Sequence, residues 1–173
     1  MTIAVVAYPV LEAASRDWIE TIRAEHDPQA PRIAAHFTIV FPIAVDPDAI
    51  TSEITAVARS QAPFGVSIET IAAVRDALGH GGHVFLVPSA GAHEIRALHD
   101  RLYAGALSPH LREDIPYTPH LTIAAHQDFA RCEALAATLN HQRFRIAGQV
   151  ERLTIVEITP GAITDGHSFE LQG

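Results

Sequence analysis

The sequence predicts a single α+β domain in which two similar halves share one hydrophobic core. Short apolar segments rich in β-branched residues alternate with segments whose apolar residues recur at helical spacing. The order strand, helix, strand, helix, strand occurs twice, displaced by about 81–84 residues. A chain of 173 residues with 48% hydrophobic residues is long and apolar enough for one sizeable core.

We place the approximate limits of the two halves at residues 1–78 and 79–173, and we allow for an exchange of segments between them. The repeat lies in the order of the elements, because few residues are identical at equivalent positions. An internal duplication and a chance recurrence of the pattern both stay open. No linker or low-complexity segment stands out, which favours one continuous domain.

Patterning and breaker residues predict five elements in the first half. Pro9 and Pro42 are expected to end strands, because proline cannot donate a sheet hydrogen bond. Asp46 followed by a proline is a typical helix start. The predicted elements are a strand over Thr2–Tyr8, a helix over Leu11–His26, a strand over Ile33–Phe41, a helix from Asp46 and a strand over Pro63–Val74.

The glycine-rich segment Gly79–Gly82 is predicted to be a turn, after which the same order begins again. Pro88 is expected to end the next strand. The predicted elements of the second half are a strand over His83–Val87, a helix over Ala92–Leu107, a strand within Pro116–Ala125, a helix over Asp128–Leu139, strands over Gln142–Ala147 and Arg152–Ile158, and a short last strand over His167–Leu171.

A His-x-Thr triplet with an apolar middle residue lies on the equivalent predicted strand of each half, at residues 36–38 and 120–122. Residues i and i+2 of a strand point to the same face, so each triplet places an imidazole beside a hydroxyl. One such triplet is common by chance, whereas two at equivalent places are informative. If the two faces are opposed, the four side chains converge on one cleft.

Two histidines and two threonines around one cleft suit the cleavage of a phosphodiester. Displacement at phosphorus needs a base and an acid, and imidazole can be either because it titrates near neutral pH. The hydroxyls can donate to non-bridging phosphate oxygens. We therefore predict His36 and His120 as catalytic residues and Thr38 and Thr122 as phosphate-binding residues. This chemistry requires no metal and no cofactor, and we predict neither.

The segments His-Phe-Thr-Ile-Val-Phe-Pro at 36–42 and Pro-His-Leu-Thr-Ile-Ala at 119–124 resemble the motifs of the two-histidine (2H) phosphoesterase superfamily, in particular bacterial 2'-5' RNA ligases and cyclic phosphodiesterases. The resemblance extends, as an order of elements, over nearly the whole chain. It implies a bilobal α+β fold with two pseudo-symmetric α/β lobes and antiparallel-rich sheets around a central groove. It also implies that His36 and His120 form the acid/base pair, and it implies the opening of 2',3'-cyclic or related cyclic phosphates.

One departure from that superfamily concerns the substrate. Members that act on RNA cyclic phosphates often carry a basic residue shortly after the second motif, whereas Ala124, Ala125 and His126 stand there in this chain. The formal net charge is -8 and every basic residue is arginine, a balance that disfavours binding of a long polyanion. We expect a small cyclic nucleotide or sugar phosphate to be favoured over RNA 3' ends.

Other functions stay open alongside this hypothesis. The resemblance raises 2'-5' RNA ligase activity, and a non-catalytic nucleotide-binding module would retain the cleft without needing an acid/base pair. The 11 histidines suggest a metal hydrolase, but His80 and His83 have no cysteine or carboxylate nearby at ligand spacing. For most histidines outside the two triplets we expect surface positions.

Three further residues are weaker candidates for the substrate groove. Tyr8 ends the strand that we expect beside His36. Tyr117 precedes His120 by three residues and could stack on a base, although strand alternation directs it away from that histidine. Arg112 lies in the loop before the second triplet and is our candidate for a phosphate or ribose contact.

The cysteine count and the lengths of the apolar stretches bear on disulfides, metal sites and membrane association. A single cysteine, Cys132, excludes an internal disulfide and a multi-cysteine zinc site. No stretch approaches the ~18 apolar residues of a membrane span, and the first residues lack the pattern of a signal peptide. We expect a cytoplasmic monomer that binds no membrane.

Overall fold

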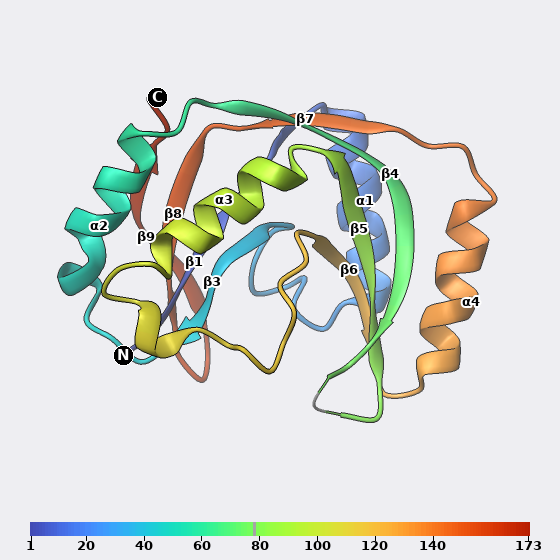
Figure 1. Ribbon diagram of the computed structural model, residues 1–173. Coiled ribbons are helices and arrows are strands. Elements are labelled where there is room, and N and C mark those ends of the chain that lie inside the picture. Colours follow the sequence, from blue (N-terminus) through green and yellow to red (C-terminus); the bar gives the residue numbers. More distant parts are fainter. Residues whose placement is uncertain (78) are drawn as a thin grey trace.

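The computed structural model describes residues 1–77 and 79–173, whose strands form one strongly curled antiparallel sheet (Figure 1). The strand order is β2-β7-β4-β5-β6-β3-β1-β8-β9, and four α-helices pack against the sheet. The predicted α+β fold is confirmed. The strands are β1 Thr2–Ala7, β2 Val10–Leu11, β3 Phe37–Ile43, β4 Phe64–Arg75, β5 Gly82–Ala90, β6 Leu121–His126, β7 Ile146–Val150, β8 Arg152–Ile158 and β9 Ile163–Glu170. The helices are α1 Ala13–His26, α2 Pro47–Arg59, α3 Ala92–Leu102 and α4 Phe129–Asn140, with a short 3-10 helix at Ser108–His110.

Strands β3 and β6 lie at the centre of the sheet and divide it into two halves. One half contains β6, β5, β4, β7 and β2, and the other contains β3, β1, β8 and β9. Helices α1 and α4 pack on the first half, and α2 and α3 pack on the second (Figure 1). The two halves are joined along a ladder with one Cα pair, Phe37 opposite Leu121.

Helices and strands cross between the halves of the sheet. Helix α1 precedes β3 in the chain but packs on β6, and α3 precedes β6 but packs on β3. Likewise β4 pairs with β5, whereas β8 returns to pair with β1. Both chain ranges thus contribute to both halves of the sheet. Leu78, at the expected limit of the first lobe, lies outside the described residues, and the lobe limits stay a prediction.

The prediction that Pro42 and Pro88 end their strands is wrong, because β3 and β5 continue past them. The register between β1 and β3 shifts between Val40 and Ile43. Pro88 pairs with Ile68 beside a similar shift in the β4–β5 ladder. Proline is tolerated at such irregularities because the missing N–H is not needed by a regular ladder.

Other element limits differ from those predicted because of local hydrogen bonds. Strand β3 begins at Phe37 instead of Ile33, since the preceding residues form a loop tied to α1. Helix α3 ends at Leu102. The backbone N–H of Ala106 donates to the Glu53 carboxylate instead of to a carbonyl of the helix. Strand β7 lies four residues later than predicted at its start, and β2 was not predicted. The turn predicted at Gly79–Gly82 connects β4 to β5.

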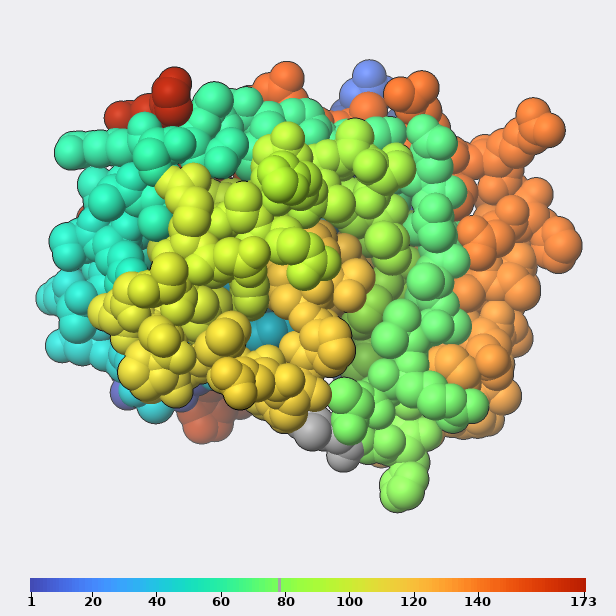
Figure 2. Space-filling view, in the orientation of Figure 1, coloured from blue at the N-terminus to red at the C-terminus, as the bar shows by residue number. Residues whose placement is uncertain are grey.

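The main hydrophobic core lies between the sheet and the helices. A second, small cluster lies on the opposite, open face of the sheet, where Ala4, Val6 and Val156 pack together. Figure 2 shows the side of α3, where cyan atoms from the region of β3 are visible in a hollow between the yellow segments that follow α3. The open face of β1, β3 and β6 is where the candidate site lies.

Candidate active site

The two predicted triplets meet where β3 and β6 run side by side. Phe37 lies opposite Leu121, and both side chains are fully buried. Continued by one residue in each direction, this antiparallel register places His36 opposite Thr122 and Thr38 opposite the second histidine, His120. Because side chains alternate between faces, all four leave the buried face of the sheet and share the open one.

The two imidazoles are held in the same way. Nδ1 of His36 lies 2.8 Å from the carbonyl oxygen of Ala34, and Nδ1 of His120 lies 2.6 Å from that of Thr118. A carbonyl oxygen only accepts, so Nδ1 carries the proton in both rings. Nε2 is therefore the lone-pair nitrogen of each neutral ring, and it is the atom through which either histidine can take up or release a proton.

Burial lowers the pKa of both imidazoles. For His120 the pKa falls to about 4, because burial outweighs the bond to the Thr118 carbonyl, which raises it; electrostatic interaction with the nearby imidazoles lowers it further. Burial also lowers the pKa of His36, against the bond to the Ala34 carbonyl, which raises it. Both rings are thus neutral at pH 7 in the free protein, and a bound anion would favour the protonated form of either.

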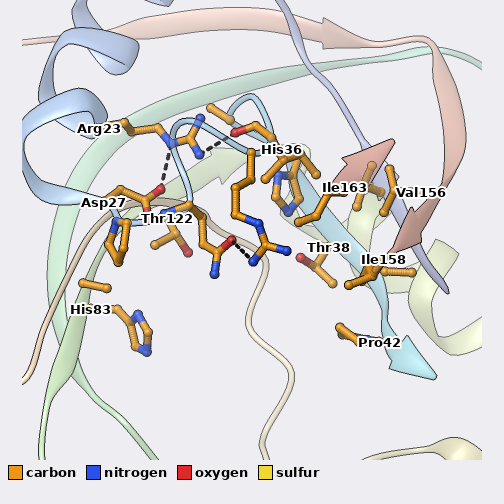
Figure 3. Close-up of a pocket in the computed structure, with 18 residues that line it drawn as sticks. Arg23, Asp27, His36, Thr38, Pro42, His83, Thr122, Val156, Ile158 and Ile163 are labelled. Carbon is orange, nitrogen blue, oxygen red and sulfur yellow. Dashed lines mark hydrogen bonds and ion pairs between the residues drawn. The ribbon is translucent and has the colours of Figure 1, made fainter. Parts of the chain in front are cut away.

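A cavity of about 390 Å³ lies beside the triplets and is lined by His36, Thr38 and Thr122 (Figure 3). In this view the three side chains lie between His83 on one side and the apolar side chains of β8 and β9 on the other. His120 is not among the lining residues. Its ring is stacked on Phe85, with 3.6 Å between the ring centroids and 18° between the planes.

A buried ionic cluster holds the loop that leads into His36. Arg23 is 1% exposed, and its guanidinium donates to the carboxylates of Glu20 and Asp27 and to the carbonyl of Ile33. Glu20 also accepts a hydrogen bond from the backbone N–H of Ala35 at 2.8 Å. The cluster thus fixes the backbone immediately before the first triplet.

The three weaker candidates lie at different places relative to the cavity. The ring of Tyr8 meets that of His36 edge to face at 6.1 Å, and its hydroxyl donates to Asp165; burial and this bond raise the pKa of Tyr8, which stays protonated. Arg112 is not among the residues that line the cavity, and its guanidinium forms a two-point ion pair with Asp114 in the same loop.

Tyr117 lies beneath the site instead of in the cavity. Its hydroxyl donates to the carbonyl oxygen of Thr38 at 2.8 Å. Its ring is stacked on that of His99, which is buried and bonded to the carbonyl of Ile39. The residue therefore ties the segment before His120 to the backbone of the first triplet. His99 is also an exception to the surface positions expected for most histidines.

Sequence reasoning missed three residues of this site. His83 and Phe85 lie on the open face of β5, where their rings are stacked at 5.7 Å, and His83 lines the cavity. Their i, i+2 spacing was the available signal. Arg32 lines the cavity from the loop before β3, and no periodicity marks a loop residue. Within residues 1–77 and 79–173, no group of three or more His, Cys, Asp or Glu side chains could hold a metal ion.

Comparison with known families settles the relationship that the paired triplets suggest. The family model of the 2'-5' RNA ligase superfamily matches residues 10–162. The chain belongs to this superfamily. The match includes both His-x-Thr triplets, and the resemblance to the 2H phosphoesterase superfamily that was inferred from the sequence is confirmed. No curated protein matches the chain by sequence.

Solved structures with a similar fold match the chain over its whole length. The protein TT0787 of Thermus thermophilus has a TM-score of 0.66 at 18% identity, covering 100% of this chain and 99% of that one. LigT of E. coli, in complexes with ATP and with 3'-AMP, has a TM-score of 0.61 at 16% identity, covering 99% of this chain and 98% of that one. At these identities the similarity concerns the fold. Among the described helices, none has the length and apolar character needed to cross a membrane.

Proposed function

We propose that the protein opens 2',3'-cyclic phosphates of nucleotides to monoesters by two-histidine acid/base catalysis without a metal. The observation that carries the proposal is the β3–β6 register, in which Phe37 lies opposite Leu121. Extended by one residue in each direction, this register puts each histidine opposite the threonine of the other triplet on the open face. E. coli LigT binds ATP, 3'-AMP and phosphate in its solved structures, and this supports a nucleotide phosphate as the ligand here.

In the proposed reaction, water attacks phosphorus while Nε2 of one histidine accepts its proton. Nε2–H of the other, protonated histidine donates to the leaving ribose oxygen as the P–O bond breaks. The hydroxyls of Thr38 and Thr122 donate to the non-bridging oxygens, whose charge rises in the transition state. The product is a ribose phosphate monoester, and each turnover exchanges the protonation of the two rings. Attack by a ribose hydroxyl on a cyclic phosphate end would use the same two proton transfers.

The function is tested with purified protein and 2',3'-cyclic AMP, with and without EDTA. We expect a single monoester product, detected by phosphorus NMR, at a rate that EDTA leaves within about twofold. Cyclic-phosphate-ended oligoribonucleotides, with and without a 5'-OH acceptor strand, measure hydrolysis and ligation in the same preparation. Loss of activity in EDTA with rescue by a divalent metal would contradict the proposed mechanism, and joined strands without hydrolysis would favour ligation.

The lowered pKa values predict the pH dependence of kcat/KM. The base must be neutral and the acid protonated, so the productive form is most populated between the two pKa values of the free protein. Both pKa values lie below 6.5. We expect kcat/KM to peak below pH 6.5 and to fall about tenfold per pH unit above it. The peak of kcat should lie at higher pH, since a bound phosphate stabilises the imidazolium. A kcat/KM maximum at or above pH 7 would contradict this assignment.

A further inference from the structure

Arg32 is a cation in the wall of the cavity. Its guanidinium donates to the side-chain oxygen of Gln29 at 3.3 Å and to the carbonyl oxygen of Thr159 at 3.2 Å, and both acceptors are neutral. In the part of the chain that the structure describes, no ion pair involves Arg32. Further N–H donors of its guanidinium are available to a ligand.

Without Arg32, the neighbouring charged residues would give this side of the cavity a net negative charge. The second arginine that lines the cavity, Arg23, is shared between the carboxylates of Glu20 and Asp27. One guanidinium and two carboxylates leave a formal charge of -1 beside the site, which would repel a phosphate. Arg32 brings this sum to zero, and its unused N–H donors can bind an anion beside the triplets.

Part of the cavity wall is apolar. Val6 of β1, Val156 and Ile158 of β8 and Ile163 of β9 line it, and they pack in the small cluster on the open face of the sheet. Figure 3 shows the three side chains from β8 and β9 grouped near Thr38. A flat apolar ring can lie on such a wall, and the cavity volume of about 390 Å³ is in the range of small-molecule sites.

We propose that this cavity binds one nucleotide unit, with Arg32 contacting its phosphate and the apolar wall carrying its base. The inference rests on the proposed function and assigns the residues that would bind the phosphate and the base of its substrate. The arginine lies in the loop before the first triplet, whereas Ala124 and Ala125 follow the second triplet in β6. In this proposal the positive charge of the site comes from the loop before the first triplet.

Binding measurements distinguish the Arg32–phosphate contact from the contact of the apolar wall with the base, and they do not require turnover. Calorimetric titration uses 3'-AMP, which has a base and a phosphate, and inorganic phosphate, which has only the charge. We expect Arg32→Gln to weaken both ligands by about 10- to 100-fold, as for a lost charge-assisted hydrogen bond. Ile163→Thr should weaken 3'-AMP and leave phosphate unchanged. Arg145→Gln, an exposed arginine in the turn before β7, is the matched control and should change neither.

Kinetics then connect the contact to the substrate. We expect Arg32→Gln to raise the KM for 2',3'-cyclic AMP more than it lowers kcat, and Arg32→Lys to recover part of the loss. Thermal unfolding of each variant checks that the loop has not been lost. Unchanged 3'-AMP affinity in Arg32→Gln would overturn the inference, as would a higher kcat/KM for a cyclic-phosphate-ended oligoribonucleotide than for 2',3'-cyclic AMP.

The inference and the proposed function can fail separately. If His36→Ala abolishes turnover while Arg32→Gln binds 3'-AMP like the parent protein, the two-histidine mechanism stands and the role of Arg32 is wrong. If Arg32→Gln loses 3'-AMP while neither histidine affects turnover, the nucleotide site stands and the mechanism is wrong.

Discussion

Replacing either catalytic candidate, His36→Ala or His120→Ala, is expected to lower kcat for 2',3'-cyclic AMP by about 10²–10⁴-fold. Each substitution removes one of the two proposed proton transfers and leaves Thr38 and Thr122 in place. KM should change much less than kcat, because the phosphate contacts proposed for these two threonines are retained. Steady-state kinetics with phosphorus NMR of the product measure both quantities.

Two controls make this result specific. His93→Ala removes an exposed histidine of α3, outside the lining of the cavity, and should keep the parent rate. The double variant of His36 and His120 should be about as slow as each single one, since an acid and a base that act in one step are not additive. A folded single variant that keeps a near-parent rate would exclude the two-histidine mechanism.

Arg23→Ala is expected to lower the free energy of unfolding by about 3–5 kcal/mol. The substitution leaves two carboxylates without their cation, and the side chain of Asp27 is only 3% exposed. It also releases the carbonyl of Ile33 and so loosens the loop that carries Arg32. For a chain of this size the melting temperature should fall by roughly 6–20 °C, as measured by calorimetry or circular dichroism.

The matched control is Arg152→Ala, which removes an exposed ion pair with Glu170. Surface pairs of this kind contribute about 0–1 kcal/mol, so this variant should unfold close to the parent protein. Arg23→Lys keeps the charge but not the two-sided geometry of the guanidinium. Its free energy of unfolding should lie between that of Arg23→Ala and that of the parent protein. A loss below about 1 kcal/mol in Arg23→Ala would show that the cluster is not needed for stability.

The grouping of His36, Thr38, His120 and Thr122 on one face of the sheet was predictable because its signals are local. Strand alternation places His36 with Thr38 and His120 with Thr122, and the occurrence of both triplets at equivalent places makes the pattern informative. The sequence also shows that the triplets occupy equivalent places in a repeated order. It does not show which strands are neighbours, and the register of Phe37 with Leu121 is what sets each histidine opposite the other triplet's threonine.

The rest of the site depends on contacts between distant parts of the chain. The apolar wall joins β1 to β8 and β9, and only the sheet order brings these strands together. Arg32 lies in a loop whose shape depends on the buried cluster around Arg23. A buried arginine in a helix has no distinctive sequence pattern, so the sequence does not predict the position of this loop. Arg112 has suitable chemistry in sequence, but Asp114, two residues later, pairs with it in the structure.

The late pairing of β1 has a consequence for how the chain folds. Strand β1 is wholly apolar from Ile3 to Ala7 and lies between β3 and β8, and β8 comprises residues 152–158. During synthesis one edge of β1 therefore stays unpaired until β8 has been synthesised. An apolar unpaired edge is a template for aggregation, and such long-range pairing slows folding. The nascent chain should be most vulnerable to misassociation just before β8 emerges from the ribosome.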